Sequence, residues 1–553
     1  MKKRLWTSIG AVLATAALLT ACGSATNTTA QSTASTAAAS QAATSTVNVA
    51  KAYSGTYVGE IQDNGVVAYK GVRYATAERW QEPVVVGQSD EEIDATQVGP
   101  ASDAGDPDCL NVIIYVNPES TNTQKSVFMW QYGSAQRGGT NARYDFSNFV
   151  KENPDIIVVC PNHRGGFFGS VDLSVLDGYD QYGDTYAKSN NLARLDLLAC
   201  LKWINQNISA FGGNPDDVTI GGHSSGSNNV SCLLLMDEAQ QYYQKAACQA
   251  SFSCDISLET KETAEFVSSD LFDRLGVTTV DEALNTSIDD IMAAQKDIMA
   301  NSANGATAYA TVENKLFSPV IDDVVIPSDY YEHLLDGVTG KTFIFGTNAG
   351  EYDQQFKDWE ENTGTNWQDA LDFTISQNWG KLSDHGWNAD NAQAVIDEYY
   401  SHNEEYGRND WTAAKDLKND LYLRCGAILY ASALAQNNTV YCYYLDWDIT
   451  PNDNMRASHG SENNVIARNW KDVPEGMRPT AAMISDMWAS FVETGNPNND
   501  EIGTTWEPYN TNTFDTLYIT DHPYMTEDVR VDDVKTVLPL FREYPQLAAA
   551  LGW

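Results

Sequence analysis

The sequence of 553 residues predicts an α/β fold with a mostly parallel, doubly wound sheet. Short apolar runs rich in β-branched residues alternate along the chain with stretches whose apolar side chains recur at helical spacing. Hydrophobic residues make up 42% of the chain and charged residues 20%, a composition that supplies a large core. Two helix-like insertions, 258–310 and 353–420, are expected to form a cap over one edge of the sheet.

Two β-like runs, 55–61 and 66–75, open the folded domain. Further strands are predicted at 112–116, 127–130, 156–160, 218–220, 245–250, 342–345 and 440–447. A helix is predicted at 192–208, because its apolar residues fall at helical spacing and Gly212 follows its end. A second helix is predicted at 227–239.

The first residues resemble the export signal of a bacterial lipoprotein. Residues 2–4 are basic and residues 5–21 form a short apolar stretch. The sequence LTACG at 19–23 looks like a lipobox, in which Cys22 becomes the mature N-terminus and carries a lipid. An ordinary signal peptide cut after Ala21 is the alternative.

The expected organisation has three parts. Residues 1–21 form the signal peptide and 22–50 form a tether that begins with the lipidated Cys22. The tether is rich in Ser, Thr and Ala, so it lacks the apolar bulk needed to fold. Residues 51–553 form the folded domain. The protein is therefore expected to be exported and held by its lipid on the outer face of a bacterial membrane.

The formal net charge of −41 argues against a nucleic-acid partner or an anionic lipid surface, because like charges repel. Eight cysteines follow Cys22, and most lie in apolar runs where a buried thiol packs as a small hydrophobic group. Their spacing matches no zinc pattern, so neither a metal nor a cofactor is expected. Whether any cysteines pair, and whether the chain forms oligomers, is left open.

The sequence GHSSG at 222–226 fits the pattern G-x-S-x-G. It follows the β-branched strand 218–220 and precedes an apolar helix, which is the setting of a nucleophile elbow. In such an elbow a strained turn projects the hydroxyl of the serine, here Ser224, from the strand end. The two outer glycines leave room for the close approach of the neighbouring strand and helix.

A serine hydroxyl becomes a nucleophile when a base, oriented by a carboxylate, lies within hydrogen-bond reach. Glu351 directly follows the strand 342–345, and His459 lies in a loop of small residues after the strand 440–447. Asp353 is the competing acid. The other histidines after it lie in polar stretches and are expected at the surface, namely His385, His402 and His522.

Ordered blocks across nearly all of residues 55–520 resemble the carboxylesterase type B family of the α/β-hydrolase superfamily. The blocks are YKGVRYA (69–75) for GIPYA, DCLNV (108–112) for EDCLYLNV, NHR (162–164) for NYR, FGGNP (211–215) for FGGDP, GHSSG (222–226) for GESAG, FSPVID (317–322) for F.PVVDG and WASFVETGNPN (488–498) for W..FA.TGNPN. By position, the family's catalytic serine, glutamate and histidine fall on Ser224, Glu351 and His459. This agrees with the choice made from the chemistry.

The resemblance implies a serine esterase that cleaves a small carboxylic ester through an acyl-enzyme intermediate. The family's oxyanion loop HGGGF is replaced by QYGSA at 131–135. Backbone amides can still form the hole, so Gly133, Ser134 and Ser225 are the expected donors, and Tyr132 is expected to form a wall of the pocket. Two alternatives remain: a surface binding protein that has lost catalysis on the same fold, and a peptidase.

Overall fold

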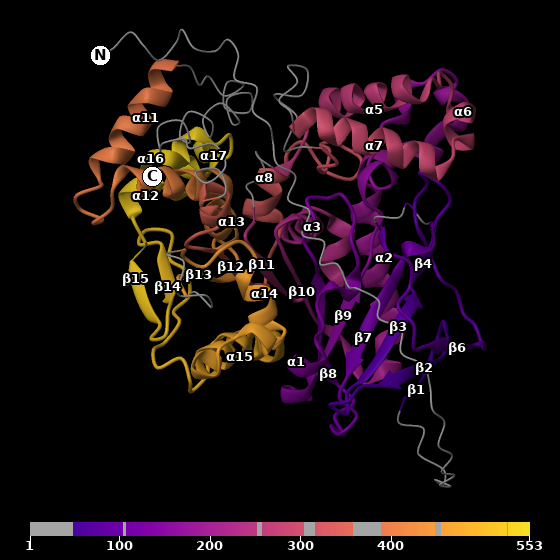
Figure 1. The fold of residues 1–553 in the computed structure, drawn as a ribbon, viewed down its shortest axis with the longest axis horizontal. Coiled ribbons are helices and arrows are strands. Elements are labelled where there is room, and N and C mark those ends of the chain that lie inside the picture. Colours follow the sequence, from indigo (N-terminus) through magenta and orange to yellow (C-terminus); the bar gives the residue numbers. More distant parts are fainter. Residues whose placement is uncertain are drawn as a thin grey trace, which may run out of the picture.

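The computed structural model describes residues 48–102, 105, 107–251, 257–303, 316–357, 389–447, 455–527 and 529–553. Within these ranges, thirteen strands form one sheet in the order β1-β2-β3-β7-β9-β8-β10-β11-β12-β13-β14-β15, with β6 beside β2 (Figure 1). The strands are β1 (Val49–Ala52), β2 (Gly55–Ile61), β3 (Val67–Arg73), β6 (Glu92–Ala95), β7 (Asn111–Val116), β8 (Lys125–Gln131), β9 (Ile156–Pro161), β10 (Gly213–His223), β11 (Lys245–Gln249), β12 (Thr342–Asn348), β13 (Thr439–Leu445), β14 (Asp515–Ile519) and β15 (Tyr524–Glu527). A separate small pair is formed by β4 (Ala75–Thr76) and β5 (Val84–Val85).

The central strands from β9 to β14 are parallel to one another. The strands β1, β2, β3 and β7 add antiparallel pairs on one side, and β15 adds one on the other. Because parallel strands end at the same edge of a sheet, β8, β10, β12 and β13 bring the residues that follow them to one place. This edge carries the candidate site.

Helices cover both faces of the sheet. They are α1 (Ser147–Glu152), α2 (Leu192–Asn207), α3 (Ser225–Leu234), α5 (Lys261–Leu275), α6 (Val280–Asn285), α7 (Ile288–Ala303), α8 (Tyr330–Glu332), α11 (Ala389–Ser401), α12 (Asp410–Asn419), α13 (Cys425–Leu434), α14 (Ser461–Ile466), α15 (Arg478–Thr494), α16 (Val531–Val537) and α17 (Tyr544–Leu551). Trp203 of α2 and Leu233 of α3 lie in one apolar core. Phe149 of α1 and Trp488 of α15 lie in a second core on the opposite face. The predicted doubly wound arrangement is confirmed.

The seven predicted buried strands all correspond to observed strands, from β7 to β13. The predicted helix 227–239 is α3, which begins two residues earlier, directly after the Ser224 turn, and ends at Leu234. Within the described residues, the insertions contain α5, α6 and α7 in one group and α11 and α12 in another (Figure 1). The strand β1 begins at Val49, two residues before the predicted domain boundary.

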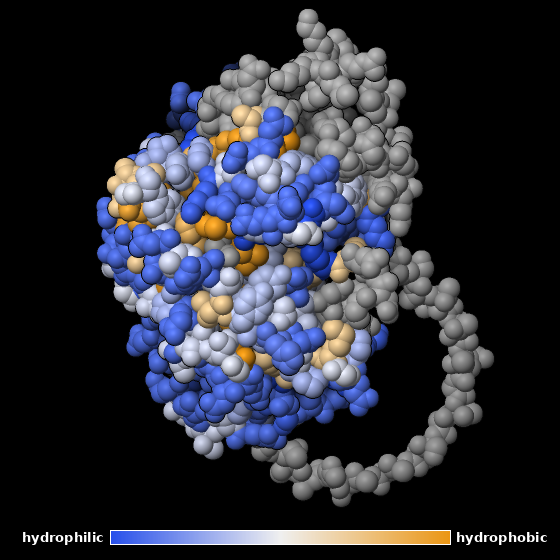
Figure 2. Space-filling view, turned by 90° about the vertical axis from the view of Figure 1, so that its left-hand side faces the viewer, coloured by the Kyte–Doolittle hydropathy of each residue, from blue (hydrophilic) through white to orange (hydrophobic). Residues whose placement is uncertain are grey.

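The predicted signal peptide, Cys22 and nearly all of the tether lie outside the described residues. None of the helices described is long and apolar enough to cross a membrane. The face shown in Figure 2 is mostly hydrophilic with small apolar patches, as expected for a strongly acidic chain. Cys160, Cys200, Cys232 and Cys248 are buried thiols, as their apolar runs predicted.

Two of the three histidines expected at the surface can be placed. His522 is exposed, as predicted. The prediction for His402 is wrong, because its side chain is only 13% exposed and its Nδ1 lies 2.9 Å from the buried Asp533 carboxylate. His385 lies outside the described residues.

Candidate active site

Ser224 lies on a sharp turn between β10 and α3. Its φ of 57° and ψ of −125° are costly for a residue other than glycine, so the surrounding packing must hold the turn. A Cβ on Gly222 would lie 2.7 Å from the Gly226 carbonyl carbon, and one on Gly226 would lie 2.4 Å from the Gln131 carbonyl oxygen. Both positions therefore require glycine, as a nucleophile elbow does.

Glu351 and His459 meet at the ends of the neighbouring strands β12 and β13. A parallel bridge between Gly350 and Ser458 sets the two loops side by side. The Nδ1 atom of His459 lies 2.6 Å from Oε2 of Glu351. The other carboxylate oxygen, Oε1, accepts the Asn348 amide N–H at 2.7 Å. Glu351 is thereby fixed in the orientation that holds the imidazole.

The His459 ring lies beside the residue that precedes Ser224. The ring centroids of His459 and His223 are 4.4 Å apart, so Ser224 follows directly on a residue in contact with the imidazole. Among the described residues, the side-chain hydrogen bond of His459 is the one to Glu351, and none joins it to the Ser224 side chain. Such bonds are often long in free enzymes and tighten when substrate binds, so the lack of a bond here does not argue against proton transfer.

The charge of Glu351 governs the protonation of His459. Burial by itself lowers the pKa of the imidazole, but the charge of Glu351, its hydrogen bond and the charge of Glu462 together outweigh burial, and the pKa lies above the ordinary value of 6.5. The side chain is 36% exposed, which leaves one side open to an incoming molecule. His459 is thus set up to accept a proton.

A second buried carboxyl group, Glu462, lies behind His459. Its Oε2 accepts a hydrogen bond from Asn348 Nδ2 at 2.6 Å, and its Oε1 accepts one from Gln249 Nε2 at 3.3 Å. Burial and the nearby charge of Glu351 raise its pKa to about 7. Glu462 was not among the residues predicted from the sequence, although its position three residues after His459 was a usable signal.

His223 also lies near the carboxyl group of Glu462. Its Nε2 lies 3.9 Å from Oε1 of Glu462. Burial, with smaller contributions from His459 and Arg143, holds the pKa of His223 well below 6.5, so this ring is neutral. The imidazole of His459, the candidate base, therefore lies beside the uncharged ring of His223 and not beside a second cation.

Asp353, the competing acid, forms ion pairs with two cationic side chains, and no hydrogen bond or ion pair joins it to His459 in the described part of the chain. Its carboxylate accepts hydrogen bonds from Nε and Nη2 of Arg456, at 3.1 and 2.8 Å, and lies 3.1 Å from Lys415 Nζ. The geometry therefore favours Glu351 as the partner of His459. Asp353 instead ties the loop after β12 to the loop that carries His459.

The loop after β8 approaches Ser224 closely at Gly133. A Cβ at this position would lie 2.6 Å from the His223 carbonyl oxygen and 2.8 Å from Ser224 Cβ. Neither the Gly133 amide nor the Ser225 amide has a hydrogen-bond partner among the described residues. The Ser134 amide, however, donates to Ser225 Oγ at 2.8 Å. In this conformation the Ser134 amide is therefore occupied by Ser225 Oγ, whereas the amides of Gly133 and Ser225 have no such partner in the described part of the chain.

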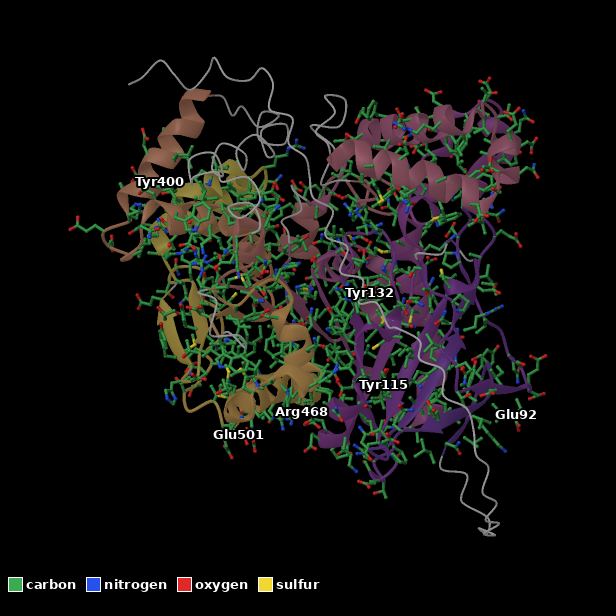
Figure 3. All side chains as sticks on the ribbon, viewed as in Figure 1. Glu92, Tyr115, Tyr132, Tyr400, Arg468 and Glu501 are labelled. Atoms are coloured by element: carbon green, nitrogen blue, oxygen red, sulfur yellow. The ribbon has the colours of Figure 1, made fainter. Side chains whose placement is uncertain are left out.

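Tyr132 lies in the interior of the molecule (Figure 3). Its hydroxyl is 2.6 Å from Ser102 Oγ, and its ring stacks on His163 with centroids 5.8 Å apart. The expectation that Tyr132 forms a wall of the pocket is wrong, because the side chain is only 3% exposed and contacts Ser102 and His163 in the interior.

The fold and the turn at Ser224 define an α/β-hydrolase. Residues 44–537 match the profile of the carboxylesterase family, so the chain belongs to that family and is a hydrolase of carboxylic esters. The para-nitrobenzyl esterase of Bacillus subtilis (strain 168) is 26% identical over 509 residues, which cover 86% of this chain and 96% of that protein. Carboxylesterase 1C of Rattus norvegicus is 25% identical over 414 residues, which cover 71% of this chain and 70% of that protein. A solved carboxylesterase structure from Geobacillus stearothermophilus superposes with a TM-score of 0.75 at 25% identity, covering 88% of this chain and 99% of that one.

Proposed function

We propose that Ser224, His459 and Glu351 are the catalytic triad of this ester hydrolase. The observation that carries the proposal is the 2.6 Å contact between His459 Nδ1 and Glu351 Oε2, next to the strained Ser224 turn. With Nδ1 bound to the carboxylate, Nε2 is the nitrogen left to act as a base.

The reaction proceeds by acyl transfer. His459 Nε2 takes the proton of Ser224 Oγ as the oxygen attacks the ester carbonyl carbon. The tetrahedral intermediate collapses, and the imidazolium returns the proton to the leaving alcohol. Water, activated by the same nitrogen, then hydrolyses the acyl-enzyme and regenerates Ser224. Glu351 holds the ring and stabilises its positive charge.

The oxyanion hole is proposed to consist of the backbone amides of Gly133, Ser134 and Ser225. Amides serve whatever side chain they carry, provided that the backbone follows the required path. The close packing of Gly133 against Ser224 supports that path. The backbone amides of Gly133 and Ser225 can donate to the oxyanion directly. The Ser134 amide can do so only after its hydrogen bond to Ser225 Oγ is replaced by one to the oxyanion.

The substrate is proposed to be a small ester, for which the name of the para-nitrobenzyl esterase relative offers one candidate class. We also propose the three-part organisation: a signal peptide at 1–21, a lipidated Cys22 with a tether to residue 50, and the hydrolase domain at 51–553. The enzyme would then act on the outer face of a bacterial membrane. The lipobox-like sequence at 19–23 supports this location.

Hydrolysis of p-nitrophenyl butyrate by the purified protein tests the proposal. Ser224→Ala is expected to lower kcat by about 10⁴-fold or more, because the members of a triad act as a unit. The matched control is Ser401→Ala, which removes an exposed hydroxyl on α11 and should leave the rate unchanged. The p-nitroanilide of the same acyl group separates an esterase from a peptidase. Full activity in Ser224→Ala would contradict the assignment.

A further inference from the structure

Ser225 differs from its counterpart in the resembling motif GESAG, where alanine follows the nucleophile. The hydroxyl of Ser225 is the atom that accepts the Ser134 amide at 2.8 Å. The residue is buried, with 4% of its surface exposed, so solvent competes little for that bond. The Ser225 side chain therefore accepts the hydrogen bond of the Ser134 amide, which is one of the proposed oxyanion donors.

We propose that Ser225 Oγ is a built-in competitor of the substrate for the Ser134 amide. The inference rests on the proposed function, because it concerns the oxyanion hole of that reaction. A backbone N–H that points at one oxygen at 2.8 Å cannot also point at a second oxygen with good geometry. The carbonyl oxygen of the ester must therefore displace Ser225 Oγ before the Ser134 amide can stabilise the developing negative charge.

The rest of the loop is held without this bond. Gln136 Nε2 donates to the Ser225 carbonyl oxygen at 3.1 Å and to Asn229 Oδ1 at 3.0 Å. Arg143 Nη1 donates to the Gly133 carbonyl oxygen at 2.9 Å. These contacts lie on both sides of Ser134, so loss of the Ser225 hydroxyl leaves the path of the loop in place.

The backbone next to Ser134 is in an unusual conformation. Ala135 and Gln136 have φ values of 52° and 63°, in the left-handed region that side chains other than glycine rarely adopt. The turn that follows Ser134 is therefore held at a conformational cost. Freeing the Ser134 N–H for the substrate requires the peptide group between Gly133 and Ser134 to rotate, which also moves the Gly133 carbonyl oxygen that accepts the Arg143 hydrogen bond.

Ser225→Ala removes the competing acceptor and keeps the Ser225 backbone amide. In this variant the Ser134 amide no longer has to give up a hydrogen bond to Ser225 Oγ before it can bind the oxyanion of the transition state. We expect kcat/KM for p-nitrophenyl butyrate to rise about 2- to 10-fold. The inhibition constant of a trifluoromethyl ketone, whose tetrahedral adduct carries an oxyanion, should fall by the same factor.

The Ser225→Cys variant is the second test, because its sulfur is a weak acceptor on a side chain of the same shape, although larger. Its kcat/KM should lie between those of the wild type and Ser225→Ala, with the melting temperature of each variant measured alongside. A fall or no change in kcat/KM in both folded variants would overturn the inference while the wild-type esterase activity stands. Absence of ester hydrolysis in the wild type would instead overturn the proposed function, and the inference with it.

Discussion

Replacing Asp353 with Asn probes the buried ionic cluster that joins the two loops of the site. The Asp353 side chain is 1% exposed and faces Arg456 and Lys415. An asparagine of the same shape leaves both cations beside an uncharged amide. Removing one partner of a buried pair typically costs about 3–5 kcal/mol. Because Arg456 keeps a second contact with Asp416, we expect the lower end, about 3 kcal/mol.

The free energy of unfolding, measured by urea titration, checks this value. The matched control is Glu119→Gln, which breaks the exposed pair with Lys151 and should change stability by less than about 1 kcal/mol. Burial opposes the charge of Asp353, but Arg456 and Lys415 lower its pKa below 3.8. The stabilisation is therefore present above pH 3.8 and is lost as the pH falls through the folded-state pKa, so the two proteins should converge in acid.

The same variant separates the two acidic residues of the loop. Folded Asp353→Asn should keep its esterase rate within about tenfold, because its contacts are structural, whereas Glu351→Gln should lose about 10³- to 10⁴-fold. A stability change below about 1 kcal/mol in Asp353→Asn would refute the account of the cluster. A folded Asp353→Asn as inactive as Glu351→Gln would refute the choice of acid.

Three further predictions concern single residues. Glu462 contributes to the raised pKa of His459, so Glu462→Gln should move the acidic limb of the pH profile of kcat/KM to lower pH. An unchanged acidic limb would show that the charge of Glu462 does not affect the pKa of His459. Tyr132→Ala empties a buried aromatic site and should cost about 3–5 kcal/mol in unfolding free energy; a stable variant that accepts bulkier esters would restore the idea of a pocket wall. Cys22→Ser should move the protein from the membrane fraction to the soluble fraction with its activity unchanged, and persistent membrane association would exclude the lipid anchor.

Local sequence predicted much of the fold because buried strands such as 156–160 carry their own apolar signal. The arrangement of the candidate site was also predictable in outline. Ser224, Glu351 and His459 each follow a strand, and parallel strands bring their ends together at one edge.

Other features depend on contacts between distant parts of the chain. His402 lies in a polar stretch, yet its partner Asp533 comes from α16, 131 residues away, so local polarity gave the wrong prediction. Tyr132 turns inward to Ser102, and no periodic pattern fixes the direction of a loop side chain. The bond between the Ser134 amide and Ser225 Oγ depends on one backbone rotation, which residue types alone do not specify.

Covalent labelling with diisopropyl fluorophosphate, followed by peptide mass spectrometry, shows which serine is activated as the nucleophile. This reagent is a general probe of serine nucleophiles that are activated by a neighbouring base. If Ser224 is the nucleophile and His459 its base, one phosphoryl adduct per chain forms on Ser224, rapidly in the wild type, far more slowly in His459→Ala, and not at all in Ser224→Ala. An adduct on another serine, or equal rates of labelling in the wild type and His459→Ala, would contradict these assignments.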